Sequence, residues 1–257
     1  FPGRFEARGG SDLPPALPDH RFVSNLVVLP GVPIALALIE ADQLRGACKN
    51  YFTVGRWADV SNAEFGVTWA TIDAPLIEIG RITVDVASPF DPDGWIRRVD
   101  RSQTLYSYVM NNYWETNYKA SQGGSATFRY AILPHGGFDQ AAAARFGIQQ
   151  SQPLLVVPVN PDAPAVRPLL TVEPSGVLVT SLKPSMDGKA IMLRLFNAGG
   201  AAEQVKLKWS EPVPARVARS SPREEAGTEL SAPLELSSLE IVTLRAESRY
   251  TLSTDQR

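Results

Sequence analysis

Short runs of β-branched and aromatic residues, separated by proline and glycine, repeat along the chain from Phe22 onward. Runs of this length between turn residues are typical of β-strands. Roughly the first 25 residues are rich in proline, glycine and charge, and predict an extended leading segment with one strand in Phe1–Arg8. The remaining predicted strands are Ile34–Glu40, Gly66–Thr71, Leu76–Ile79, Leu105–Asn111, Thr127–Leu133, Leu154–Pro158, Leu169–Glu173, Val177–Pro184, Ala190–Asn197, Gln204–Lys208, Ala215–Ser220, Leu234–Leu236 and Glu240–Ala246.

Several of these runs alternate with a period of two. In Thr127–Leu133 the side chains of Phe128, Tyr130 and Ile132 fall on one face, and Ala190–Asn197 alternates in the same way. This period places every second side chain on the same side of a sheet, as a strand requires.

One helix is predicted over Phe138–Gly147. Asp139 is a suitable N-cap, four alanines give high helix propensity, and Gly147 can take the left-handed conformation that ends a helix. A helix of about ten residues is marginal in water, so we expect it to pack on a sheet.

Many short strands with one helix predict an all-β, antiparallel sandwich architecture. Pro161–Pro168 carries three prolines in eight residues, which marks a domain boundary. We therefore expect a larger β domain over residues 1–167 and a smaller β-sandwich lobe over residues 168–257.

Composition narrows the possible functions. Of the 257 residues, 44% are hydrophobic and the net charge is −2, which favours a packed core and gives no basic surface for nucleic acid or a membrane. Cys48 is the single cysteine, so no internal disulfide forms. The chain begins at Phe1 without a methionine or a leader-like segment, and we expect it to be an internal part of a longer polypeptide.

Groups that could bind a transition metal are scarce. The sequence holds His20, His135 and Cys48, far apart and without any paired metal-binding motif. We therefore predict no metal site in this chain. His135 follows a predicted strand in a glycine-rich turn, and we interpret it as a surface or capping histidine.

A glycosidase needs two carboxylates on either side of a sugar ring. The candidates are Asp59, Glu64, Asp73, Glu78 and Glu115. The first two lie in a turn-like stretch and Asp73 lies in a loop before a proline, so each also has an ordinary structural explanation. We expect no catalytic pair within the chain.

Asn111–Tyr118 combines three aromatic residues, three asparagines and one glutamate. Aromatic faces and amide or acid groups are what a sugar-binding loop needs. The alternative is a structural loop whose amides bond to backbone and whose tryptophan anchors the core.

These residues, with several other stretches in the same order, resemble bacterial members of glycoside hydrolase family 38. The resemblance covers roughly Phe22–Ala246, and it rests on Met110–Ala120, Gly123–Gly124, Phe128–Tyr130, Arg56–Asn62, Gly66–Thr71, Asp73–Leu76, Leu195–Ala198 and Glu240–Leu244.

The resemblance implies the C-terminal β region of a multi-domain, retaining α-mannosidase. In that family the region contains a supersandwich similar to the galactose-mutarotase fold, while the nucleophile and the zinc ligands belong to an N-terminal catalytic domain. This chain then corresponds to a non-catalytic part, inactive alone and without a cofactor of its own. Its expected partners are the parent's own catalytic domain, which would carry zinc, and carbohydrate.

The resemblance also implies that loops of the β region help to shape the sugar pocket. The expected substrate-binding residues are Asn111, Asn112, Tyr113, Trp114, Glu115 and Asn117, followed by Arg56, Trp57, Asp59 and Asn62.

Two other functions compete with the family 38 interpretation. One is an autonomous carbohydrate-binding module. The other is a sugar isomerase of the mutarotase type, which needs a histidine and a carboxylate together in a groove. Two isolated histidines speak against the isomerase.

Overall fold

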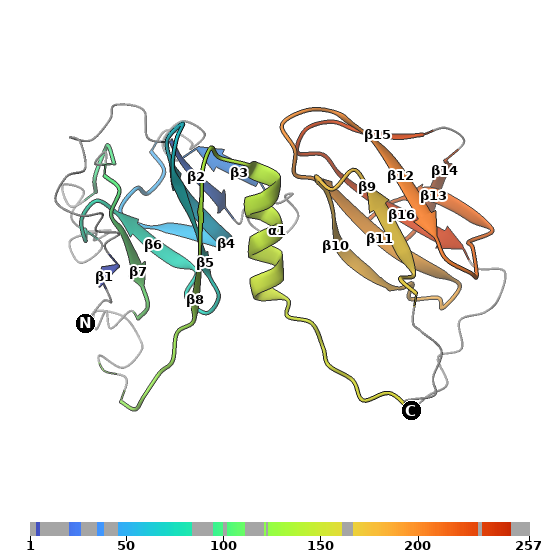
Figure 1. Cartoon of the computed structure of the whole chain (residues 1–257), viewed down its shortest axis with the longest axis horizontal. Helices are drawn as coiled ribbons and strands as arrows, with labels where there is room; N and C mark the ends of the chain where they lie inside the picture. The colour runs from blue at the N-terminus through green and yellow to red at the C-terminus, as the bar shows by residue number, and fades with distance from the viewer. Residues whose placement is uncertain are drawn as a thin grey trace. The chain divides into compact units, whose positions relative to one another are not determined.

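The computed structural model describes residues 4–5, 21–26, 35–38, 46–83, 95–99, 102–110, 121, 123–160, 167–230 and 233–247. Within these ranges all strand pairing is antiparallel and there is one short helix, which confirms the predicted all-β class (Figure 1). No helix in the described part of the chain is long and apolar enough to cross a membrane.

The chain divides into two compact units. The first contains Phe1–Asp139 and Phe146–Pro153, and the second contains Gln140–Arg145 and Leu154–Arg257. The boundary predicted at residue 167 differs from this division, because it assigns residues 140–145 and 154–167 to the first domain.

The first unit is built on an eight-stranded sheet with the order β1-β7-β6-β4-β2-β3, to which β5 and β8 attach through β4. Its core contains apolar side chains of β4 to β7 and of the segment before β7. The strands are β1 (Arg4–Phe5), β2 (Arg21–Leu26), β3 (Ala35–Leu38), β4 (Phe52–Ser61), β5 (Gly66–Thr71), β6 (Leu76–Ile79), β7 (Leu105–Tyr108) and β8 (Tyr130–His135).

Strand β4 is the centre of this unit because it pairs with β2, β5 and β6. It was not predicted, and the stretch interpreted as a turn is strand as far as Ser61. The actual turn is Asn62–Phe65: the Asn62 side-chain oxygen accepts hydrogen bonds from the backbone N–H groups of Glu64 and Phe65, both at 2.8 Å. An asparagine side chain that bonds two residues ahead is a standard way to close a hairpin.

The helix α1 (Gln140–Ser151) confirms the predicted helix, and Asp139 precedes its first residue. The prediction that Gly147 ends the helix is wrong, because α1 continues for another turn. The reason for a glycine here is close packing. A Cβ on Gly147 would lie 2.6 Å from Trp57 Cδ1 and 3.1 Å from Arg56 Cβ.

The second unit is a β-sandwich. A five-stranded sheet, β10-β11-β16-β13-β14, and a three-stranded sheet, β15-β12-β9, contribute side chains to one apolar core, which includes Leu193, Leu195, Leu236 and Leu244. The strands are β9 (Leu170–Glu173), β10 (Val177–Pro184), β11 (Ala190–Asn197), β12 (Glu203–Trp209), β13 (Arg216–Ser220), β14 (Ala226–Glu229), β15 (Leu234–Leu236) and β16 (Ile241–Glu247).

The predicted alternation in β11 is confirmed at its centre, where Leu193 and Leu195 are fully buried and Arg194 between them is exposed. At the end of the strand Asn197 is also fully buried. Its amide nitrogen donates to the carbonyl oxygens of Leu236 and Ser237, each at 3.0 Å. Asn197 therefore joins β11 to the end of β15.

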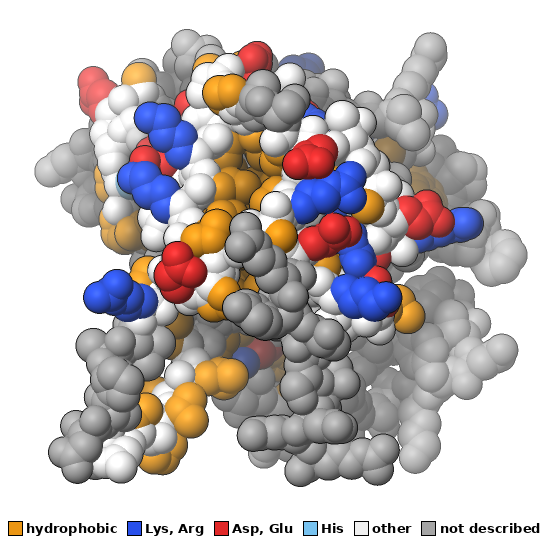
Figure 2. Space-filling model, turned by 90° about the vertical axis from the view of Figure 1, so that its right-hand side faces the viewer, with side chains coloured by type: hydrophobic (Ala, Val, Ile, Leu, Met, Phe, Trp, Pro, Cys, Tyr) orange, Lys and Arg blue, Asp and Glu red, His pale blue; other side chains and the backbone are white. Residues whose placement is uncertain are grey.

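Charged side chains of the second unit form ion pairs at its surface. Arg245 on β16 is almost buried and donates to Asp187 at 2.7 Å and to Glu247 at 3.2 Å. The pKa of the Asp187 carboxyl is lowered, first by its hydrogen bond from Ser185 and next by that from Arg245. On the face drawn in Figure 2, acidic and basic side chains lie next to one another among the described residues.

The prediction of a strand at Leu154–Pro158 is wrong. These residues are extended but pair with none of the described strands, and Figure 1 draws them as a coloured tube without an arrow after α1. Conversely, β2 and β14 were not predicted.

Candidate functional site

Three adjacent strands bring a carboxylate, a hydroxyl and an imidazole together in the first unit. Asp59 on β4 lies opposite Thr68 on β5, and β5 also pairs with β8, whose last residue is His135. Thr68 Oγ1 donates to Asp59 Oδ2 at 2.6 Å, and His135 Nε2 lies 2.7 Å from the same oxygen. We call Asp59, Thr68 and His135 the Asp59 cluster.

A glycine makes room for the imidazole. Gly66 is the partner of His135 in the ladder between β5 and β8. A Cβ on Gly66 would lie 2.2 Å from His135 Cε1 and 2.5 Å from Ser61 Cβ, so no larger residue fits there without a shift. The position of the histidine thus depends on the absence of a side chain across the ladder.

The interpretation of His135 as a surface or capping residue is wrong. Its side chain is only 18% exposed, and the Asp59 side chain is fully buried. His135 Nδ1 lies 3.0 Å from the carbonyl oxygen of Gly136. Each ring nitrogen of His135 therefore faces an acceptor oxygen.

Both described hydrogen bonds of Asp59 meet at the same carboxylate oxygen, Oδ2. The second carboxylate oxygen, Asp59 Oδ1, is buried without a hydrogen-bond partner among the described residues. A catalytic carboxylate must reach its substrate, and this one does not reach the surface. The pair therefore lacks the accessible acid that the isomerase alternative requires, although the structure does bring a histidine and a carboxylate together.

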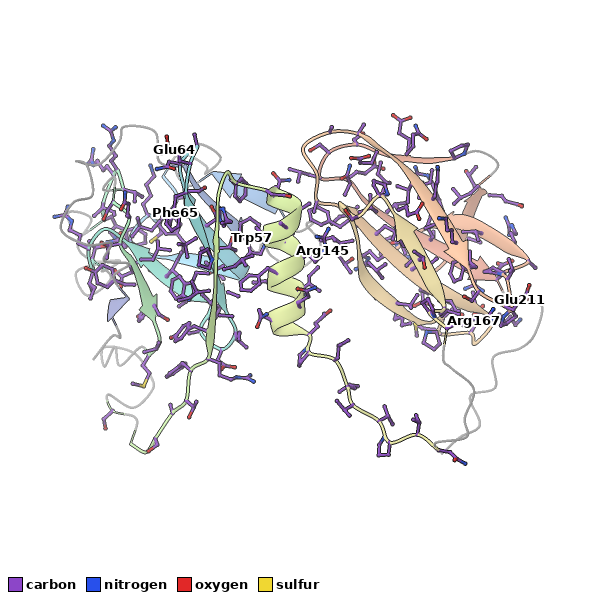
Figure 3. The ribbon with its side chains drawn as sticks, in the orientation of Figure 1. Trp57, Glu64, Phe65, Arg145, Arg167 and Glu211 are labelled. Carbon is purple, nitrogen blue, oxygen red and sulfur yellow. The ribbon has the colours of Figure 1, made fainter. Side chains whose placement is uncertain are left out.

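Two more of the candidate carboxylates have internal partners. Asp73 accepts from the backbone N–H, Nε and Nη2 of Arg129 at 2.8, 2.9 and 2.8 Å. These side-chain hydrogen bonds, with the backbone bond next, lower the pKa of the Asp73 carboxyl from 3.8 to about 2. Glu78 is buried and accepts from the backbone N–H of Thr83 at 2.6 Å. Glu64 projects from the turn between β4 and β5 (Figure 3).

The expected site residues on β4 make contacts within the unit. Trp57 is buried and its ring centroid lies 6.1 Å from that of Phe138, and Figure 3 shows it beside α1. Arg56 is half-buried, and desolvation lowers its pKa. Asn62 closes the hairpin, and Asp59 belongs to the cluster described above.

The loop Asn111–Tyr118, with its six expected site residues, lies outside the described residues. The described strand before it, β7, ends at Tyr108, whose ring meets that of Tyr51 edge to face at 5.9 Å. On the same strand, Ser107 Oγ lies 2.8 Å from the hydroxyl of Tyr130 on β8. These tyrosines were not predicted as site residues, since their proximity depends on strand pairing.

The described residues contain no group of three or more His, Cys, Asp or Glu side chains that could hold a metal ion. The zinc that the family resemblance implies is expected in a separate catalytic domain and stays a prediction.

The sandwich of the second unit resembles a known domain. Residues 176–244 match the model of the glycosyl hydrolases family 38 C-terminal β-sandwich domain. Residues 176–244 are therefore similar to the C-terminal β-sandwich domain of glycosyl hydrolase family 38. No curated protein sequence matches the chain.

Two solved structures share the fold of this chain. One is a glycosyl hydrolase family 38 protein from Enterococcus faecalis, with 16% sequence identity and a TM-score of 0.57 over 77% of this chain and 23% of that one. The other is an α-mannosidase from Enterococcus faecalis V583, with 16% identity and a TM-score of 0.59 over 88% of this chain and 24% of that one. The chain thus spans about a quarter of either protein's length.

Proposed function

We propose that this chain is the non-catalytic C-terminal β region of an α-mannosidase-like glycoside hydrolase. The observation that carries the proposal is the family 38 β-sandwich match at residues 176–244. The fold agrees over 88% of the chain with one quarter of an α-mannosidase. In this proposal the remainder of a longer parent polypeptide performs the hydrolysis and holds the zinc.

The arrangement of the carboxylates supports a non-catalytic role. Retaining glycosidases need two carboxyl groups about 5–5.5 Å apart that face the sugar. Here Asp59 is buried among three strands and contacts His135, and Asp73 accepts hydrogen bonds from Arg129. Glu78 is buried and accepts a hydrogen bond from a backbone N–H group. Each of these groups already serves as an acceptor within its own unit.

We further propose that the region packs on the parent's catalytic domain and helps to shape its sugar pocket. Loops at strand ends are common carriers of binding residues on a rigid scaffold. The loop Asn111–Tyr118 begins three residues after β7 ends at Tyr108, and its composition suits sugar hydroxyls and C–H faces. An autonomous carbohydrate-binding module would use the same loop without a catalytic partner.

The experiment compares the product of the complete reading frame with a version that lacks residues 1–257. The complete product is expected to hydrolyse an aryl α-mannoside, and the shortened product is expected to lose most of that activity because its pocket is incomplete. Equal kcat/KM values for the two would show that this region does not contribute to the pocket. A complete product that binds mannose but hydrolyses nothing would favour the binding module.

A further inference from the structure

The apolar segment Leu154–Val159 is almost entirely exposed. The exposed fractions of its residues are 95% for Leu154, 89% for Leu155, 96% for Val156, 70% for Val157 and 72% for Val159. The segment is extended and unpaired among the described strands. Contiguous exposed apolar surface of this kind marks an interaction site.

Both faces of the apolar segment are hydrophobic. In an extended chain Leu154 and Val156 point to one side, and Leu155 and Val157 point to the other. A strand with one face in water alternates apolar with polar residues, whereas a strand covered on both faces reads as a continuous apolar run. The segment therefore fits a position between two layers of protein.

The prolines indicate which backbone edge pairs. Successive N–H groups of a strand point to opposite edges, and proline has none to donate. Pro158 removes a donor from the edge that carries the N–H groups of Leu154 and Val156. Pro153 lies on the other edge but precedes the segment, so within the segment that edge keeps the donors of Leu155, Val157 and Val159, and strand addition is expected there.

The charge of the segment restricts its partner. No charged residue occurs between Phe146 and Pro161, although 20% of the whole chain is charged. A lipid surface would leave the backbone N–H groups of an isolated strand without partners and would favour basic residues, which are missing. An apolar protein groove with a free strand edge satisfies both the side chains and the backbone.

We infer that Leu154–Val159 is a strand whose sheet is completed by the parent polypeptide outside these 257 residues. This inference rests on the proposed function, and it names the contact through which the two parts of the parent are joined. The matched part makes up 23% and 24% of the two family 38 structures, so about three quarters of each such chain is available to cover the segment.

Amide hydrogen exchange tests the inference directly. In the 257-residue chain the amides of Leu155, Val157 and Val159 are expected to exchange as in an open strand. In the product of the complete reading frame they should exchange at least about 10-fold more slowly, as paired amides do. Val156→Lys should abolish that protection. The matched control is Met186→Lys, which adds the same charge at a residue that is 91% exposed, and it should leave protection unchanged.

Equal exchange in the short chain and the complete product would overturn the inference. A concentration-dependent dimer of the short chain that Val156→Lys dissociates would show that a second copy covers the segment instead. Sedimentation of the short chain with phosphatidylcholine–phosphatidylglycerol vesicles would assign it to lipid. Hydrolysis of an aryl α-mannoside is measured on the same samples. Protection without hydrolysis refutes the proposed function alone, and hydrolysis without protection refutes the inference alone.

Discussion

Replacing His135 by leucine should destabilise the first unit through the charge that it leaves behind. Asp59 is fully buried, and its Oδ2 accepts from Thr68 and contacts His135 Nε2 at 2.7 Å. His135→Leu removes the imidazole and leaves the carboxylate with the threonine hydroxyl as its described side-chain partner. Removing one partner of a buried ion pair is costly because the other charge stays desolvated.

The expected magnitude follows from this burial. Loss of one partner of a buried pair costs about 3–5 kcal/mol, and the partial exposure of His135 places the effect near the lower value, about 3 kcal/mol. For a protein of this size 1 kcal/mol shifts the melting temperature by roughly 2–4 °C, so the shift should be about 6–12 °C. The double variant Asp59→Leu/His135→Leu should lose less than His135→Leu, because no unpaired charge remains.

Thermal denaturation measures the loss of stability in His135→Leu. Hydrogen exchange, measured on the same variant, shows which of the two units is destabilised. Exchange should accelerate in β4, β5 and β8, and it should not change in β11 and β16 of the second unit. A control on the same strand is Tyr130→Phe, which loses the hydrogen bond to Ser107 and should cost about 1 kcal/mol or less. A stability of His135→Leu within 1 kcal/mol of the unchanged protein, or equal acceleration in both units, would refute this reasoning.

Three further predictions follow from particular residues. The pKa of the Asp73 carboxyl is lowered to about 2. The ionised carboxylate therefore stabilises the fold fully above the ordinary pKa of 3.8, and this stabilisation is lost as the pH falls toward 2. Asp73→Asn should flatten the pH dependence of the free energy of unfolding in that window and nowhere else. Gly147→Ala should lower the melting temperature despite the roughly 1 kcal/mol gain in helix propensity, whereas Gly123→Ala, with open space around it, should not. In the product of the complete reading frame, Glu115→Gln and Asn112→Ala should lower kcat/KM by about 10-fold or more while the melting temperature stays unchanged. If both variants keep wild-type kinetics, the loop Asn111–Tyr118 has a structural role and does not bind substrate.

The strand pattern of the second unit could be predicted from sequence because its two faces differ clearly. In β11 buried Leu193 and Leu195 flank exposed Arg194, and in β16 buried Val242 and Leu244 flank Thr243. Strands with one buried face carry this signal in their own residues. The predicted ranges of β5, β6, β10, β11 and β15 coincide with the observed ones.

The central strand β4 was missed because its polar residues are satisfied by distant partners. Asp59 looks like a turn residue in the local sequence, but His135, 76 positions away, makes its burial possible. The prediction of a strand at Leu154–Pro158 was wrong for the opposite reason. Its residues favour a strand, but a strand also needs a neighbouring strand to pair with. Gly147 resembles a helix stop in the local sequence, but its missing side chain leaves the space that the indole of Trp57 fills.

The site residues were also hard to predict, because contacts between residues far apart in the sequence leave no local signal. Composition alone indicated the loop Asn111–Tyr118, which lies outside the described residues and stays a prediction. The pairing of Asp59 with His135 had no local signal, because it arises when β4, β5 and β8 align. Asn62 could have been recognised as a hairpin residue from Asn62-Ala63-Glu64-Phe65, since asparagine favours such turns.

The most direct test of the central claim is the activity of the 257-residue chain alone. Highly purified chain is incubated with an aryl α-mannoside, with and without added zinc, and its melting temperature is followed in parallel. The account predicts no turnover above the blank and no saturable rise in melting temperature with zinc, because a native-state ligand would stabilise by RT ln(1 + [L]/Kd). Turnover that follows the protein peak through purification would contradict it.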